Sequence, residues 1–197
     1  MNEPHSAFTW QQDMRAEALR LNREEFLSRY PNPVLWVTPP PGTAGVSAQE
    51  SNPVDPVESY RRTILQDDSL DADPAAAAAY LDRVAPLDKR PNNPFPNMIS
   101  VGRAGNNDVV IALGSISKLQ AYFMREGDNW SLTDWSSTNG TTISNKRVEP
   151  RKPQRLESGV QVSFGKEFWA LFLLPEQLYR ELRAETPTEG LKLETKL

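Results

Sequence analysis

Cysteine is absent from this 197-residue sequence, and histidine occurs once, as His5 near the N-terminus. Without cysteine the chain can form neither disulfides nor thiolate metal sites, and it has no thiolate nucleophile. One histidine near a terminus is a poor basis for an imidazole metal cluster or a Ser-His-Asp triad. These absences argue against redox, zinc and nucleophilic chemistry, and we expect neither a metal ion nor a cofactor.

Long apolar runs and an excess of basic residues are also missing. No stretch approaches the length of about 18 apolar residues that suggests a bilayer-spanning helix, and the N-terminus lacks the profile of a signal peptide. We therefore expect a cytoplasmic protein without a membrane partner. The formal net charge of -4 argues against nucleic-acid binding, which depends on many Lys or Arg contacts to phosphate. Any anion-binding site must therefore be formed by a few residues at one place on an otherwise acidic protein.

The residues that are present fit one ordered domain with irregular extensions. Hydrophobic residues make up 38% of the chain, enough for a sizeable core, while 17 prolines indicate much loop or extended structure. A capping box of Thr9 and Gln12 predicts a helix over roughly 10–29. The stretch VLWV is typical of a buried strand. Two Asp-Pro pairs predict short helices within the proline-rich segment 38–97, one from Asp55-Pro56 and one from Asp73-Pro74 into AAAAAYLDRV.

From Met98 the pattern changes to short apolar or alternating segments separated by turn residues. This is typical of an antiparallel β-sandwich, because the spacings leave no room for helical crossovers. The expected strands are MISVG, DVVIA, LQAYFMRE, WSLTDW, TTIS, KRVEP, GVQVSFG and EFWALFLL. A C-terminal helix follows from Pro175. We predict three parts: an N-terminal helical extension over 1–30, a mainly β sandwich over 31–174 with an insertion over 38–97, and a helix and tail over 175–197.

Four motifs of this β region occur in a fixed order: SVGRAGNNDVVI, SISKLQAYF, WSLTDWSSTNGTTIS and LESGVQVSFG. Together they resemble the pattern of the forkhead-associated (FHA) domain family over roughly 98–174. Gly-Arg or Asn-Gly alone is common by chance, whereas four ordered motifs are far more specific. The resemblance implies an eleven-stranded β-sandwich whose loops at one end bind a phosphothreonine peptide. It also makes 38–97 an insertion between the first two strands.

The resemblance implies binding roles for five residues. Arg103 would offer its guanidinium to phosphate, Ser117 would add a hydroxyl donor, and Lys118 would add an ammonium group. Thr138 would contact the phosphate at the edge of its loop, and Asn139 would bind the peptide backbone beside the phosphothreonine. Together these residues form the predicted phosphopeptide site.

Other residues of the motifs are expected to shape the loops. Gly102 and Gly140 would serve the turns rather than the ligand. Gln120 stands where the family has a histidine that buttresses the loops, and its amide has a donor and an acceptor that can partly take over that role. Ser144-Asn145 stands where the family often has Asn-Gly, and Asn145 tolerates a left-handed backbone better than most residues.

Two features have a second interpretation. The STNG stretch also fits an ordinary hairpin turn, because Asn-Gly between apolar segments is a strong hairpin signal. A group of basic residues fits either a solvated edge that discourages strand aggregation or a surface that favours acidic residues flanking a phosphothreonine. These basic residues are Lys146, Arg147, Arg151, Lys152 and Arg155.

We therefore predict a non-enzymatic signalling module that binds a phosphorylated protein partner, with a Ser/Thr protein kinase or its substrate as candidates. The sequence contains no P-loop signature, since GRAGNN lacks the required glycine spacing and the following Lys. The alternative is a phosphate-independent scaffold. It would use the N-terminal helix and the 38–97 insertion as a surface for a partner or for self-association.

Overall fold

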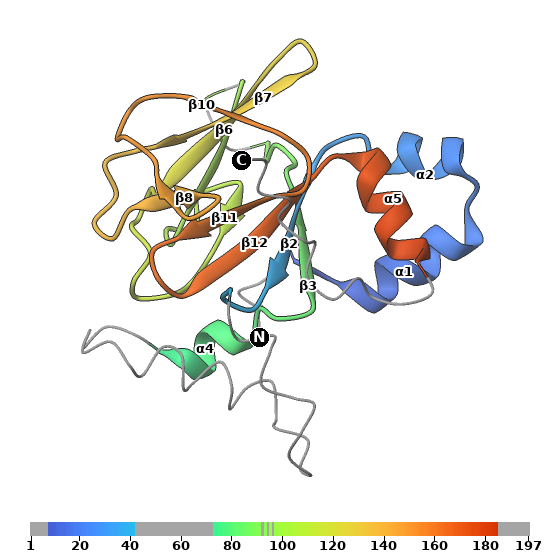
Figure 1. Ribbon diagram of the computed structural model, residues 1–197, viewed down its shortest axis with the longest axis horizontal. Helices are drawn as coiled ribbons and strands as arrows, with labels where there is room; N and C mark the ends of the chain where they lie inside the picture. The colour runs from blue at the N-terminus through green and yellow to red at the C-terminus, as the bar shows by residue number, and fades with distance from the viewer. Residues whose placement is uncertain (1–7, 42–72, 92, 94, 96, 185–197) are drawn as a thin grey trace, which may run out of the picture.

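A computed structural model describes residues 8–41, 73–91, 93, 95 and 97–184. Within this part of the chain, two sheets face each other as a β-sandwich, which confirms the predicted mainly β fold class (Figure 1). The helix predicted from Asp55-Pro56 lies outside the described residues.

The larger sheet has seven described strands in the order β1-β3-β2-β12-β11-β8-β9. Their bounds are β1 (Thr9–Trp10), β2 (Val34–Thr38), β3 (Arg83–Pro86), β8 (Thr141–Ile143), β9 (Lys146–Arg147), β11 (Val160–Phe164) and β12 (Phe168–Leu173). The smaller sheet has five described strands in the order β10-β7-β6-β4-β5. Their bounds are β4 (Met98–Gly102), β5 (Val109–Val110), β6 (Ala121–Glu126), β7 (Asn129–Asp134) and β10 (Gln154–Leu156).

The strand pairing differs from the expectation in one place. Strands β4 and β5 pair in parallel, with Val101 opposite Val109 and Gly102 opposite Val110, whereas we predicted antiparallel pairing throughout. No crossover helix is needed because β5 lies beside the last residues of β4, so the loop 103–108 has to lead the chain back by only a residue or two. Strands β1, β3 and β10 were not predicted, and β3 lies inside the segment 38–97.

Alternating side chains of the central strands divide between two apolar layers. In β12, Phe168, Ala170 and Phe172 face the core between the sheets, while Leu173 faces the opposite side, as the two-residue period of a strand requires. Aromatic rings link the two sheets across the core. Phe123 of the smaller sheet stacks on Phe172 of the larger sheet, with ring centroids 6.0 Å apart. This core holds the strand ends from which the site loops leave.

Helices α1 (Gln11–Arg20), α2 (Arg23–Arg29) and α5 (Pro175–Arg183) form a group on one side of the sandwich (Figure 1). Their apolar residues cover the outer face of the larger sheet and form the second core cluster. Its buried members are Met14, Ala18, Phe26, Val34, Val84, Leu173, Leu178 and Leu182. The predicted C-terminal helix is therefore confirmed as α5, with Leu178 and Leu182 at the i and i+4 spacing of one buried helix face.

The predicted N-terminal helix is two helices rather than one. The chain bends at Leu21, and Asn22 starts α2 with a capping box in which its side chain accepts from the Glu25 N–H at 3.0 Å. The capping box predicted at Thr9 and Gln12 is wrong, because Trp10 is the residue before α1 and it makes no side-chain cap. The break lets Phe26 turn back into the same apolar cluster as α1.

The alanine-rich helix is also shorter than predicted. Helix α4 (Pro74–Ala78) begins as expected at Asp73, whose carboxylate accepts from the Ala76 N–H at 3.0 Å, but the chain re-enters the sheet at β3 instead of continuing as a helix. Tyr80 packs edge-to-face on Phe8 with ring centroids 5.0 Å apart. Burial in the sandwich therefore overrides the helix propensity of alanine.

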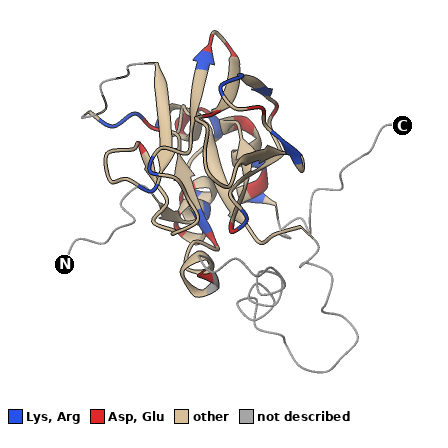
Figure 2. Ribbon diagram, turned by 90° about the vertical axis from the view of Figure 1, so that its left-hand side faces the viewer, with Lys and Arg blue, Asp and Glu red and all other residues tan. Residues whose placement is uncertain are grey.

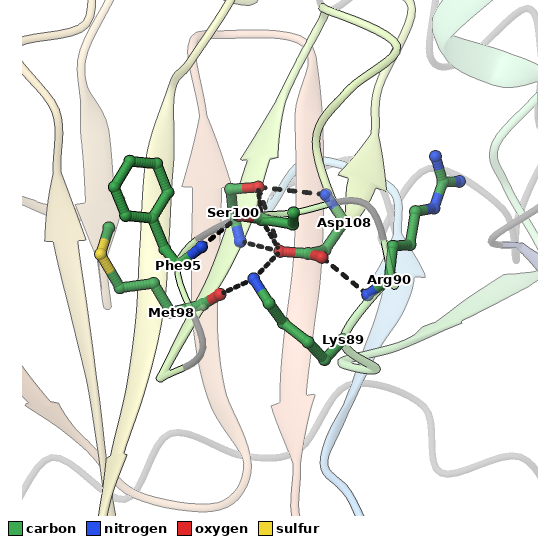
Figure 3. A network of polar contacts seen from close by, with 7 residues as sticks. Lys89, Arg90, Phe95, Met98, Ser100 and Asp108 are labelled. Carbon is green, nitrogen blue, oxygen red and sulfur yellow. Dashed lines mark hydrogen bonds and ion pairs between the residues drawn. The ribbon is translucent and has the colours of Figure 1, made fainter.

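A buried carboxylate fastens the segment before β4 to the smaller sheet (Figure 3). The Asp108 side chain, which is fully buried, accepts from the backbone N–H of Ser100 at 2.7 Å and from that of Arg90 at 2.8 Å. Its Oδ2 also accepts from the ammonium group of Lys89 at 3.3 Å and from the Asn93 amide. A buried charge needs several such donors to offset its desolvation.

The described residues contain neither a candidate membrane span nor a candidate metal cluster. None of the helices in this part of the chain has the length and apolar character needed to cross a membrane. In the same part, no group of three or more His, Asp or Glu side chains is arranged to hold a metal ion.

We predict that Asp108→Asn lowers the free energy of unfolding by about 2 to 4 kcal/mol, because the neutral amide leaves Lys89 without its buried partner and turns a donor toward other donors. Asp128→Asn is the matched control, since the Asp128 side chain is fully exposed, and it should stay within about 0.5 kcal/mol. Urea denaturation measures both. Equal stabilities of the two variants would contradict the role given to the network.

Candidate functional site

Three loops leave the sandwich at the same end. The register determines this, because the end of β4 and the end of β7 both pair with the start of β6: Val101 and Asp134 lie opposite Ala121. The loops are 103–108 after β4, 112–120 before β6, and 135–140 between β7 and β8. These loops carry the five residues of the predicted phosphopeptide site together with Gln120 and Gly140, and Gly102 lies at the end of β4.

Arg103 is exposed and tied to the neighbouring loop at its base. Its backbone N–H donates to the Ser117 carbonyl at 2.9 Å, and its Nε donates to the Ile116 carbonyl at 3.0 Å. Among the described residues its two terminal nitrogens have no hydrogen-bond partner. The guanidinium is thus held at one edge and keeps the fork that binds an anion in a bidentate manner.

Ser117 and Thr138 meet across two loops. The Ser117 Oγ accepts from the Thr138 N–H at 3.0 Å and lies 3.4 Å from the Thr138 Oγ1. The longer distance is a weak hydrogen bond at best. The Ser117 hydroxyl hydrogen can therefore turn toward an incoming acceptor, and the exposed Thr138 hydroxyl lies beside it.

Asn139 reaches back to the loop before β6. Its Nδ2 donates to the Ser115 carbonyl at 2.7 Å, and within the described part of the chain its Oδ1 has no donor. The hairpin interpretation of STNG is wrong, because the segment leads from β7 of one sheet to β8 of the other. Gly140 has a φ of +86° while Asn139 does not have a positive φ, whereas a type I′ hairpin turn needs two such residues.

The tight hairpin turn occurs one step further along the chain. Ser144 and Asn145, between β8 and β9, have φ values of +48° and +63°, the left-handed pair that a type I′ turn requires. The expectation that this turn survives without Asn-Gly is confirmed.

Gly102 and Lys118 pack backbone against backbone. A Cβ atom on residue 102 would lie 2.4 Å from the Lys118 carbonyl oxygen, so only glycine fits. The same oxygen accepts from the Asn107 side-chain amide at 2.7 Å. The Lys118 side chain is exposed at the same end of the sandwich, and its ammonium group has no partner among the described residues.

Gln120 is fully buried and bridges two of the loops. Its Oε1 accepts from the Ser117 N–H at 3.0 Å, and its Nε2 donates to the Gly140 carbonyl at 2.8 Å. The same nitrogen lies 3.2 Å from the Thr141 hydroxyl. The amide thus uses its donor and its acceptor at once, as a loop buttress must.

Asp134 is a structural residue of the site that the sequence analysis noted only as part of a motif. Its Oδ1 accepts from the Ser137 N–H at 2.9 Å, and its Oδ2 accepts from the Thr141 hydroxyl at 2.7 Å. A carboxylate three residues before a turn N–H is a recognisable local signal. This carboxylate shapes the first half of the loop 135–140.

Glu167 and Tyr80 are further supports that the sequence analysis missed. The buried Glu167 carboxylate accepts from the Ser115 hydroxyl and from the Asp73 N–H, the latter at 2.6 Å. The Tyr80 hydroxyl accepts from the Ala112 N–H at 2.8 Å, and burial raises the pKa of Tyr80 above its usual value. Both contacts join the segment around α4 to the loop 112–120, across sequence separations that no local pattern reveals.

Comparison with known proteins supports the family resemblance. The family model "FHA domain" matches residues 99–165, which run from the second residue of β4 to the end of β11 and hold all three loops. Protein FraH of Nostoc sp. is 26% identical over 110 residues, which cover 56% of this chain and 34% of FraH. The chain thus spans about one third of the length of that relative.

Solved structures with similar chains include FHA domains. One is the FHA domain of an Arabidopsis thaliana protein, with 26% identity and a TM-score of 0.38, covering 45% of this chain and 72% of that chain. Another is EmbR of Mycobacterium tuberculosis in complex with a low-affinity phosphopeptide. It has 18% identity and a TM-score of 0.41, and covers 62% of this chain and 32% of that chain.

We predict that Gln120→Leu lowers the free energy of unfolding by about 1 to 3 kcal/mol, because the Ser117 N–H and the Gly140 carbonyl lose a buried partner. Amide hydrogen exchange at Ser117 should become faster. Gln154→Leu, at an exposed position of β10, is the control and should change stability by less than about 0.5 kcal/mol. Unchanged exchange at Ser117 in the Gln120 variant would show that the bridge does not hold the loop.

Proposed function

We propose that the FHA domain at residues 99–165 is a phosphorylation-dependent interaction module that binds phosphothreonine-containing peptides. Arg103, Ser117, Lys118, Thr138 and Asn139 would make the contacts. The partner would be a phosphorylated protein, such as a Ser/Thr protein kinase or its substrate, in a cytoplasmic signalling assembly. The role is binding without catalysis, since these side chains are suited to hold an anion and a peptide backbone.

The observation that carries this proposal is the juxtaposition of Arg103, Ser117 and Thr138. Their loops are linked by hydrogen bonds between 2.9 and 3.0 Å, while the ends of their side chains keep donors to spare. Because these donors are already held in place, little conformational entropy is lost when a ligand binds.

A phosphate group matches this set of donors. A phosphothreonine carries a charge of about −1.5 to −2 at neutral pH and offers three acceptor oxygens. Arg103 can take two of them in charge-assisted bonds, and the Ser117 hydroxyl can donate to the third. An unmodified threonine offers one neutral hydroxyl, so binding should depend on phosphorylation.

Asn139 suits the peptide backbone beside the phosphothreonine. Its Nδ2 is held by the Ser115 carbonyl, which fixes the side chain, and its Oδ1 remains as an acceptor for a peptide N–H. Lys118 would add a mobile positive charge from the neighbouring loop.

The scaffold alternative has less support. Met14, Ala18 and Phe26 of the N-terminal helices are buried against the larger sheet and α5, although Trp10 and Leu19 are exposed. That face is therefore already occupied within the chain.

We predict that Arg103→Ala abolishes measurable binding of a phosphothreonine peptide, through the loss of a charge-assisted bidentate contact, equivalent to about 2 to 4 kcal/mol. Arg125→Ala is the matched control, since Arg125 is an exposed arginine near the hairpin tip at the other end of β6. Fluorescence anisotropy with peptides selected from a phosphothreonine library measures the effect.

Each selected peptide is compared with its unphosphorylated twin. Wild type and Arg125→Ala should bind only the phosphorylated form, with equal affinity. Equal binding of both peptide forms, or full binding by Arg103→Ala, would refute the proposed function and favour the scaffold.

A further inference from the structure

Arg147 lies next to the proposed recognition loop without belonging to it. The tight turn at Ser144 and Asn145 folds β9 back onto β8, so that Arg147 pairs with Thr142. The following N–H, that of Val148, donates to the Thr141 carbonyl at 2.9 Å. Arg147 is thereby carried back to the point where the loop 135–140 enters β8.

The guanidinium of Arg147 occupies the space beside Gly140. A Cβ atom on residue 140 would lie 2.7 Å from the Arg147 Cζ and 2.8 Å from its Nη2. Any other side chain at position 140 would therefore displace the arginine, in addition to straining a backbone with a φ of +86°. Glycine at this position leaves room for a positive charge directly beside Asn139.

The charge on Arg147 is not compensated by the surrounding side chains. Arg147 is exposed, and within the described residues its side chain has no ion pair or hydrogen bond. The nearby Asp134 carboxylate is buried and used by the loop. The exposed Glu149 forms an ion pair with Lys152, with 2.6 Å between nitrogen and oxygen.

The other basic residues of the same group are placed differently. The Arg151 guanidinium lies 5.0 Å from the ring centroid of Trp135 and donates to the Ser136 hydroxyl at 3.1 Å. Arg155 lies on β10 of the smaller sheet. Lys146 precedes Arg147 on β9, and successive strand residues point to opposite faces. Figure 2 shows Lys and Arg segments spread over several parts of the ribbon, but Arg147 is the one placed against Gly140.

We propose that Arg147 determines specificity by selecting phosphothreonine peptides that carry an acidic side chain close to the phosphothreonine. This inference rests on the proposed function, because Asn139 would hold the peptide backbone beside Arg147. Arg147 lies against Gly140, the neighbour of Asn139, and three residues of extended peptide span about 10 Å, so we expect the acidic residue within about three positions of the phosphothreonine. In this proposal the basic group is more than a solvated edge, because Arg147 recognises the negative charge of a peptide side chain.

The test uses wild type, Arg147→Gln and Lys146→Gln with a phosphothreonine peptide library that is degenerate at the flanking positions. The acidic position that wild type enriches is then examined in a matched pair of phosphopeptides, one with Glu and one with Gln. Wild type should bind the Glu peptide about fivefold more tightly at low salt, the size expected of one exposed ion pair. Added salt should reduce this ratio.

Arg147→Gln should bring the ratio close to one while binding the Gln peptide within about twofold of wild type, which shows that the phosphate contacts are intact. Lys146→Gln should keep the wild-type ratio. The proposal is overturned if wild type shows no acidic preference, if Arg147→Gln keeps it, or if Lys146→Gln loses it equally. The failure of the proposed function is a separate result, because it is seen by comparing each phosphopeptide with the same peptide without phosphate. If wild type binds both forms equally, the proposed function is refuted as well.

Discussion

The side-chain amide of Gln120 is the contact on which the arrangement of the loops depends. It is buried, and it joins the Ser117 N–H on one side to the Gly140 carbonyl on the other. Gly140 is buried and Ser117 is half-buried, so each of these backbone groups would be costly to leave without a partner. The positions of Ser117 and Thr138 relative to each other, and through Ser117 that of Arg103, follow from this bridge. A glutamine can do this work because it has a donor and an acceptor at its tip.

The parts of the fold that the sequence predicted are those set by local pattern. Short apolar or alternating segments between turn residues located nine of the twelve described strands, and the spacing of Leu178 and Leu182 located α5. The wrong predictions lie where contacts between residues far apart in the chain determine the local structure. The alanine run stops early because Tyr80 packs into the core, and β3 exists because Val34 and its neighbours offer it a partner strand. The break before α2 does have a local signal in the sequence, the capping box of Asn22 and Glu25.

The candidate site shows the same division. Arg103, Ser117, Thr138 and Asn139 were singled out through an ordered set of motifs, and the fold brings them to one end of the sandwich. The supports around them come from residues far apart in the chain, such as Glu167 with Ser115, so sequence spacing gives no hint of them. Arg147 belongs with these, since its place beside the loop depends on a two-residue turn and on the missing side chain of residue 140.

The most direct test of the central claim is a nuclear magnetic resonance titration of the full chain with a phosphothreonine peptide and its unphosphorylated twin. The phosphorylated peptide should shift backbone amide signals mainly in the loops 103–108, 112–120 and 135–140, including those of Arg103 and Thr138. The unphosphorylated twin should leave these signals in place. Shifts that are the same for both peptides, or that map to α1 and α4 instead of the three loops, would contradict the account.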